Sequence, residues 1–86
     1  MDIQTIPKLA PGCRLHPTES TLLIPEGTLT LSETARDILL SVDGRRTVAE
    51  IVEALLAEYA GADRAMIQDD VVALLDRMAQ RGVIRA

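Results

Sequence analysis

One stretch of the chain, Thr28 to Gly44, carries a strand pattern and a helix pattern with no loop between them. Thr28 to Leu31 alternates threonine with leucine, which places both leucines on one face of a strand. Ser32 follows at once and is a favoured residue for capping the start of a helix. The helix is predicted from apolar residues at helical spacing, namely Ala35, Ile38, Leu39 and Val42. We therefore expect a short strand that leads directly into a short helix, with Gly44 as the left-handed cap just past its end.

The part of the chain before this stretch predicts two more short strands. Residues 1–12 contain two prolines and are expected to form an extended arm, held to the body of the protein by Ile6 or Leu9. Strands are predicted over Cys13–His16 and Thr21–Ile24. Turns that contain proline separate these strands from each other and from the strand described above, which indicates an antiparallel meander.

Two longer helices are predicted after the first. Thr47 and Glu50 have the spacing of a capping box at the start of a helix. The wide apolar face of this helix comprises Val48, Ile51, Val52, Leu55, Leu56 and Tyr59. Asp63 is expected to cap a third helix that closes at Gly82, and its apolar stripe comprises Ile67, Val71, Leu74, Leu75 and Met78. The next residues, Val83 and Ile84, are expected to fold back as an apolar tail.

Strands in the first part of the chain and helices in the second indicate an α+β fold. The expected architecture is winged-helix-like, with an N-terminal three-stranded antiparallel sheet followed by a three-helix bundle. Strands of about four residues cannot form a stable sheet alone, so the sheet is expected to lie on the helices. The length of 86 residues leaves room for one core, and we expect a single domain over residues 1–86.

Composition argues against several classes of protein. Cys13 is the only cysteine, so an internal disulfide is excluded, and a reducing compartment, the cytoplasm, is expected. No stretch approaches the roughly 18–20 apolar residues of a membrane span, and residues 1–12 lack the pattern of a signal peptide. The net charge of −4 and the near absence of aromatic side chains argue against binding to nucleic acid or to an anionic membrane.

Catalysis finds little support in the sequence. His16 is the only histidine, and it lies three residues from Cys13, so the two side chains point to opposite faces of a strand and make a poor nucleophile–base pair. Asp69 and Asp70 lie about 100° apart around a helix and cannot easily share one metal ion. We therefore predict a protein without enzymatic activity and without a bound metal or cofactor.

The last two predicted helices resemble a helix-turn-helix unit, which makes a small winged-helix DNA-binding transcriptional regulator the alternative hypothesis. Residues 47–60, however, carry three glutamates and no basic residue, and residues 63–82 carry four aspartates against three arginines. Only Arg45 and Arg46 are well placed for phosphate, and two phosphate contacts give weak binding at physiological salt. Recognition of DNA is therefore the less favoured hypothesis.

Recognition of a peptide is the hypothesis that the pattern favours. If Thr28–Leu31 is the last strand of the meander, one of its edges is open, and an extended peptide can add there as a further strand. The hydrogen bonds of such an edge only balance the cost of ordering a peptide, so affinity requires an apolar groove beside the edge. The residues predicted to form the edge and the groove are Thr28, Leu29, Thr30, Leu31, Asp70, Val71, Leu74, Arg77, Met78 and Arg81.

The charges of this predicted site suggest the chemistry of the peptide. Arg77 and Arg81 lie one turn apart on the third helix and are expected to steer an acidic peptide toward the groove. The alternative interpretation is that the apolar residues of the site belong to the core and that both arginines are simply solvated.

The order of short motifs along nearly the whole chain resembles the PqqD family of pyrroloquinoline quinone (PQQ) biosynthesis. The matching residues are Pro7–Leu9, Arg14–Leu15, Leu23–Glu26, Leu31–Ser32, Ile38–Leu39, Asp43–Val48, Glu50–Val52, Ile67, Asp70–Val71 and Gly82–Ile84. No single motif is diagnostic, but the ordered set is specific. The stretch between Leu15 and Leu22 is shorter than the family pattern, which predicts short first and second strands.

This resemblance implies a winged-helix peptide-recognition domain, a RiPP recognition element, of the kind that serves pathways modifying ribosomally made peptides. In that family the domain acts as a chaperone that binds the precursor peptide PqqA as an added strand between the third strand and the third helix. It presents the peptide to the radical S-adenosylmethionine (radical SAM) enzyme PqqE, which cross-links a glutamate and a tyrosine of the peptide. The corresponding positions here are Thr28–Leu31 and Asp70–Arg81. The implied partners are thus a PqqA-like peptide and a PqqE-like enzyme, although related domains also occur in other peptide-modifying pathways.

An open strand edge also bears on oligomeric state. Edges can pair with a second copy of the same chain, and short hinges permit domain swapping. We therefore expect a monomer, or a weak or domain-swapped dimer.

The predicted edge leads to a mutational expectation. Leu29→Pro should abolish peptide binding while leaving the helices folded, because proline removes a strand N–H donor. An unchanged affinity in calorimetry would count against the edge.

Overall fold

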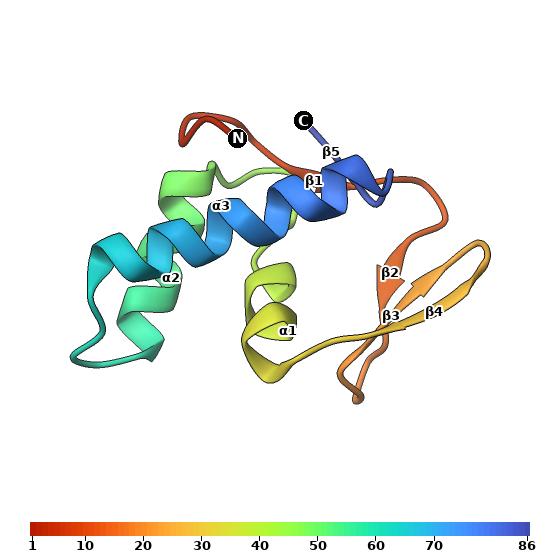
Figure 1. The fold of residues 1–86 in the computed structure, drawn as a ribbon, viewed down its shortest axis with the longest axis horizontal. Coiled ribbons are helices and arrows are strands. Elements are labelled where there is room, and N and C mark those ends of the chain that lie inside the picture. Colours follow the sequence, from red (N-terminus) through yellow and green to blue (C-terminus); the bar gives the residue numbers. More distant parts are fainter.

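The computed structural model describes residues 1–86 and confirms the α+β fold, with a three-stranded antiparallel sheet before three helices (Figure 1). The elements along the chain are β1 (Lys8–Leu9), β2 (Arg14–Leu15), β3 (Thr21–Ile24), β4 (Gly27–Thr30), α1 (Glu33–Leu40), α2 (Val48–Glu58), α3 (Arg64–Gln80) and β5 (Ile84–Arg85). No helix is both long enough and apolar enough to span a membrane.

The three-stranded sheet has the strand order β2-β3-β4, as expected for a meander. β2 is shorter than the predicted strand Cys13–His16, and β4 begins one residue earlier than predicted and ends at Thr30. The alternation of β4 holds, because Leu29 is half-buried and the next inward residue, Leu31, is buried, whereas the two threonines are exposed. The sheet therefore turns one apolar face toward the helices.

A second, two-stranded sheet was not predicted from the sequence. β1 pairs with β5 in antiparallel register, Lys8 opposite Arg85 and Leu9 opposite Ile84 (Figure 1). The expected apolar tail is therefore a strand. Paired strands of two residues each carry too little alternation to be recognised in a sequence.

The segment before β1 closes the start of α2. The first N–H groups of a helix have no partner within the helix. In α2, the N–H of Val48 donates to the carbonyl of Thr5 at 2.9 Å, and that of Ala49 donates to the carbonyl of Ile3 at 2.9 Å. Of the two residues expected to hold this segment to the body, Leu9 packs against the core and Ile6 is exposed.

The first helix begins as predicted and ends earlier than predicted. The hydroxyl of Ser32 accepts the N–H of Ala35 at 3.1 Å, which caps the start of α1. The helix stops at Leu40, so Gly44 is not its left-handed cap; that prediction was wrong. Gly44 has φ 77° within the turn that precedes α2, where the carboxylate of Asp43 accepts two backbone N–H groups.

The caps of the other two helices confirm the sequence predictions. Thr47 and Glu50 form a reciprocal capping box at the start of α2. Asp63 caps α3 by accepting the N–H of Ala65 at 3.1 Å, and Gly82, with φ 77°, follows the end of that helix. These local hydrogen bonds satisfy groups that a helix end otherwise leaves unpaired.

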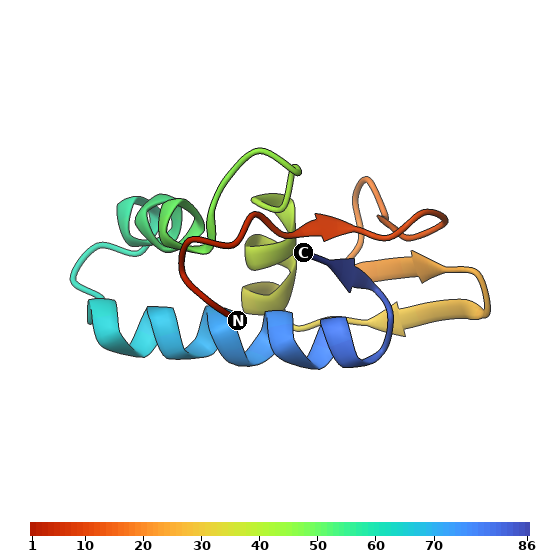
Figure 2. The same cartoon turned by 90° about the horizontal axis from the view of Figure 1, so that it is seen from above.

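The core lies where the three helices meet the inner face of the sheet. Its most completely buried side chains are Leu22, Leu39, Val48, Ile51, Val52, Val71 and Leu75. Helix α3 packs along α2 and against β5, whereas α1 packs against α2 and β2 and makes little direct contact with α3. In Figure 2, α3 and β4 lie on the same side of the molecule, and β4 leads directly into α1. Side chains of α3 on one side and of the β4–α1 segment on the other line a groove between these elements.

Candidate functional site

The outer strand of the sheet, β4, has one open edge. It pairs with β3 on one side, and no other strand pairs with it. Such an edge presents backbone N–H and C=O groups that another extended chain can bind.

The register of the sheet determines which groups the open edge presents. The N–H of Leu31 donates to the carbonyl of Ser20 at 2.8 Å, and the same register places Leu22 opposite Leu29. Since every second residue of an antiparallel strand bonds to the same neighbour, Leu29 and Leu31 bond to β3. The N–H and C=O groups of Thr28 and Thr30 therefore point to the open edge.

This geometry corrects the reason given for one expected mutational effect. The N–H of Leu29 belongs to the β3–β4 ladder and does not lie on the open edge. Leu29→Pro would therefore damage the sheet itself, and a loss of binding in that variant would not test the edge. Thr28 and Thr30 are the informative positions.

Beside this edge lies a hollow of about 250 Å³ between the end of β4, the start of α1 and the last turns of α3, which we call the strand-side hollow. Its lining includes six of the predicted site residues, namely Thr30, Leu31, Leu74, Arg77, Met78 and Arg81. Ser32 and Ala35 complete it. The structure thus brings together two parts of the chain, residues 30–35 and 74–81, that are far apart in the sequence.

Two further hollows continue this groove along α3. The middle hollow, of about 250 Å³, shares Leu74 and Arg77 with the strand-side hollow and also contains Asp70. The helix-end hollow, of about 230 Å³, lies where α1, the end of α2 and the start of α3 meet, and contains Asp70 and Val71. Thr28 and Leu29 line none of the hollows.

The apolar residues of the predicted site are mostly part of the core. Val71 is 0% exposed, and Leu74 and Met78 are 4% and 8% exposed. The alternative interpretation, that these side chains belong to the core, is therefore correct for most of their surface. They form the floor of the groove and leave little apolar surface of their own for a ligand.

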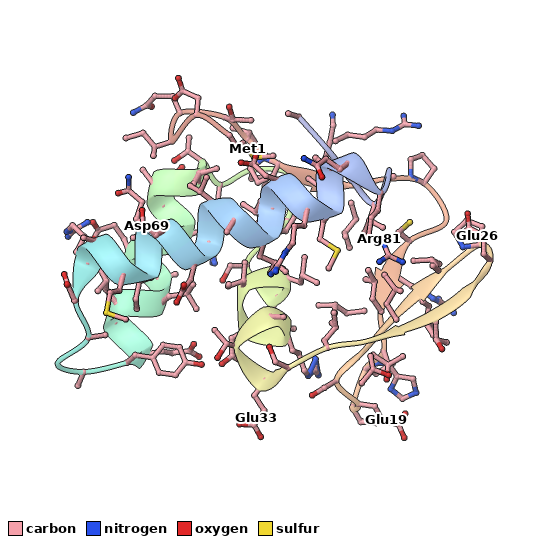
Figure 3. The ribbon with its side chains drawn as sticks, viewed as in Figure 1. Met1, Glu19, Glu26, Glu33, Asp69 and Arg81 are labelled. Atoms are coloured by element: carbon pink, nitrogen blue, oxygen red, sulfur yellow. The ribbon has the colours of Figure 1, made fainter.

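The charged residues of the site are free of partners. Arg77 and Arg81 are exposed and take part in none of the salt bridges of the protein. In Figure 3, Arg81 lies between the end of α3 and the β3–β4 hairpin. Arg81 also lines a fourth hollow, of about 480 Å³, at the β3–β4 turn, so positive charge borders the groove where the strand edge begins.

Sequence reasoning missed the α1 side of the groove. Thr34, Ala35 and Ile38 line it from α1, and Ala73 lines it from α3. The alanines are the signal that could have indicated it, because small side chains on facing helices leave the space between them unfilled. No sequence pattern, however, shows that α1 and α3 face each other.

The side chains considered for chemistry lie in different surroundings. The Nδ1 atom of His16 accepts the N–H groups of Thr18 at 3.1 Å and Glu19 at 3.0 Å, which fixes the ring in the β2–β3 turn. Cys13 instead lines the hollow at the β3–β4 turn. No group of three or more histidine, cysteine, aspartate or glutamate side chains is arranged to hold a metal ion.

Tyr59 and Asp37 form a hydrogen bond at the rim of the helix-end hollow. The Tyr59 hydroxyl donates to the Asp37 carboxylate and so links the end of α2 to α1. This bond, with the negative charge of the carboxylate, raises the pKa of Tyr59 from 10.0 to about 12. The phenol is thus held in its neutral, donating form.

The comparisons with known proteins agree with this fold. The family model for coenzyme PQQ synthesis protein D (PqqD) matches residues 19–84. The chain belongs to the PqqD family.

The solution NMR structure of the PqqD truncation of Methylobacterium extorquens PqqCD matches 99% of this chain and 94% of that one, with a TM-score of 0.83 at 35% sequence identity. That protein is described as a functional, stand-alone RiPP recognition element.

Curated relatives extend the comparison. A PqqA binding protein of Stutzerimonas stutzeri is 47% identical over 60 residues, which cover 70% of this chain and 63% of the relative. A PqqA binding protein of Xanthomonas euvesicatoria is 35% identical over 83 residues, which cover 92% of this chain and 89% of the relative. The bifunctional coenzyme PQQ synthesis protein C/D of Methylorubrum extorquens is 39% identical over 83 residues, which cover 92% of this chain but only 22% of that relative.

The Tyr59–Asp37 bond predicts an unusual titration. In Asp37→Asn, the pKa of Tyr59 should fall from about 12 toward 10.0, because the carboxylate that stabilises the neutral phenol is gone. Since Tyr59 is the only tyrosine and the chain has no tryptophan, ultraviolet absorbance during alkaline titration reports this residue alone.

The sign of the effect on stability also follows. Because folding raises the pKa of Tyr59, the Tyr59–Asp37 hydrogen bond contributes fully to folding stability below pH 10.0. This contribution is lost as the pH rises to about 12. Glu58→Gln is the control, since Glu58 affects Tyr59 less than Asp37 does. An equal shift in both variants would contradict the assignment to the hydrogen bond.

Proposed function

We propose that this chain is a non-catalytic chaperone of PQQ biosynthesis that binds a PqqA-type precursor peptide as an added strand along β4. In this proposal the peptide lies between Thr28–Leu31 and the face of α3 from Asp70 to Arg81. The observation that carries the proposal is the open edge of β4 beside an adjoining groove. Membership of the PqqD family, and the PqqA binding proteins among its relatives, support the choice of peptide.

The open edge alone supplies too little free energy. Thr28 and Thr30 offer two N–H and two C=O groups, and each ladder hydrogen bond contributes about 0.5–1.5 kcal/mol. Ordering a peptide costs about 1–2 kcal/mol per residue, so four ordered residues roughly cancel the hydrogen bonds. Net affinity must come from apolar side chains of the peptide, each contributing about 1.5–3 kcal/mol when buried in the groove.

Two unpaired arginines beside the strand-side hollow favour a peptide with an acidic segment. Arg77 and Arg81 have no acidic partner in the protein and border the strand-side hollow. Their positive charge stands out on a chain with a net charge of −4. An acidic segment of the peptide would therefore approach this end of the groove in preference to the rest of the surface.

The chemical step belongs to a partner in this proposal. The chain would present the bound peptide to a radical SAM enzyme of the PqqE type, which modifies it, and would itself require no metal or cofactor. Strand addition supports such a role because it holds a flexible peptide extended and in one register. The same edge can pair with a second copy of the chain, so a weak or domain-swapped dimer would compete with the peptide.

No structural observation favours the alternative of a DNA-binding regulator. The exposed residues of α2 are Glu50, Glu53, Ala57 and Glu58, and Glu53 is paired with Arg64 of α3. A helix that enters the major groove needs basic side chains for the phosphates, but α2 has none, and residues 63–82 carry four aspartates against three arginines.

Thr30→Pro tests the strand edge directly. The variant removes an N–H that points away from β3, so the sheet should survive while peptide affinity in calorimetry falls by at least about tenfold. Thr30→Val is the matched control, because it keeps the N–H and the branched side chain and should bind like the parent. Equal affinity of Thr30→Pro and Thr30→Val, with far-ultraviolet dichroism unchanged, would refute strand addition at this position.

Arg77→Glu tests electrostatic steering. At low salt the association rate of a PqqA-type peptide should fall by roughly tenfold, and the difference should shrink as salt is added. Arg45→Glu makes the same change of charge in the turn before α2, away from the hollows, and should have little effect. Stopped-flow measurement would contradict the proposal if both variants slowed association equally.

A further inference from the structure

The lining of the helix-end hollow is mostly apolar, and a peptide strand added beside β4 does not account for this feature. Six of its eight lining residues are hydrophobic, against four of eight in the strand-side hollow. Its floor is buried core, but Ile67 is only partly buried and Tyr59 is 38% exposed. An apolar recess with partly exposed walls is where a ligand can still bury surface, which the strand-side hollow offers only sparingly.

The helix-end hollow is continuous with the groove beside β4. It shares Thr34, Ile38 and Asp70 with the middle hollow, which in turn shares Leu74 and Arg77 with the strand-side hollow. Along α3 the distance from the level of Met78 to that of Ile67 is about 16 Å. An extended chain covers this distance in about five residues.

The direction of the peptide follows from the sheet. All pairings of the three-stranded sheet are antiparallel, and antiparallel addition is the common mode in such sheets. Because β4 runs toward α1, an antiparallel partner runs from α1 toward the β3–β4 turn (Figure 1). The helix-end hollow therefore lies on the N-terminal side of the added strand.

The charges along the groove give the peptide a polarity. Asp70 lines the helix-end hollow, and the carboxylate of Asp37 is bound to Tyr59 at its rim. Arg77 and Arg81 border the opposite, strand-side end. A complementary peptide has acidic residues in the strand segment and a basic residue near the hollow.

We propose that the precursor peptide has a second anchor, an apolar side chain about five residues N-terminal to its strand segment and next to a basic residue, which inserts into the helix-end hollow. This inference rests on the proposed function, since it deepens the description of the same ligand. It divides recognition into a strand that fixes the register and a side chain that supplies much of the affinity.

The single tyrosine makes the anchor observable. In a sample with isotope-labelled tyrosine rings, isoleucine methyl groups and backbone amides, the unlabelled peptide is silent in NMR spectra. The probe is the synthetic full-length PqqA peptide encoded in the same genome. Saturation should shift the amides of Thr28 and Thr30 and also the signals of Tyr59 and Ile67. A peptide truncated before the strand segment should shift the two amides alone.

A filling mutation provides the matched test. Ala62→Leu adds bulk to a residue that lines the helix-end hollow and should weaken the full-length peptide by about tenfold. Ala60→Leu makes the same change two residues away, at an exposed position that lines none of the hollows, and should leave affinity unchanged. The truncated peptide should bind both variants equally.

The outcomes separate this inference from the proposed function. Shifts at Thr28 and Thr30 without shifts at Tyr59 and Ile67, together with equal affinities of Ala62→Leu and Ala60→Leu, would overturn the anchor and leave strand addition standing. Binding of the full-length peptide without shifts at Thr28 and Thr30 would overturn the proposed mode of strand addition. Absence of any binding would overturn both.

Discussion

The pairing of β3 with β4 is the constraint on which the proposed site depends. Its register commits the backbone of Leu29 and Leu31 to the sheet and leaves that of Thr28 and Thr30 on the open edge. The same alternation turns the leucines toward the core and the threonines toward solvent. A register shift of one residue would expose the leucines and would turn the N–H and C=O groups of Thr28 and Thr30 away from the open edge. Burial of the apolar face therefore also fixes the register.

The groove exists because the chain has no loop between β4 and α1. Ser32 lies just after β4 and already caps the helix, so α1 starts at the end of the open edge. Helix α3 is held by α2 and β5, and α1 by α2 and β2, which leaves the space between α1 and α3 to small side chains such as Ala35 and Ala73. The caps and strand pairs of the fold thus fix the elements that form the walls of the groove.

Features set by neighbouring residues were predictable from the sequence. The caps at Ser32, Thr47 and Asp63 depend on side-chain oxygens within three residues of their partners, and all three are present. The β1–β5 sheet was not predictable, because its pairing joins two-residue strands from distant parts of the chain. The earlier end of α1 was not predictable either, since glycine permits a left-handed turn at Gly44 without requiring the helix to reach it.

The site was predictable only in part. Periodicity placed Leu74, Arg77, Met78 and Arg81 on one side of a helix, and the structure brings them beside Thr30. The register of the β3–β4 pair decides whether an N–H of β4 points to β3 or to the open edge. The packing of the helices decides whether α1 forms a wall of the groove. Local spacing carries no information about either.

Amide hydrogen exchange tests the central claim most directly. In the free protein, Leu29 and Leu31 should exchange slowly because their N–H groups are in the sheet, whereas Thr28 and Thr30 should exchange fast. Saturation with the PqqA-type peptide should protect both threonines. Peptide binding that leaves the amides of Thr28 and Thr30 as fast as in the free protein would contradict the account.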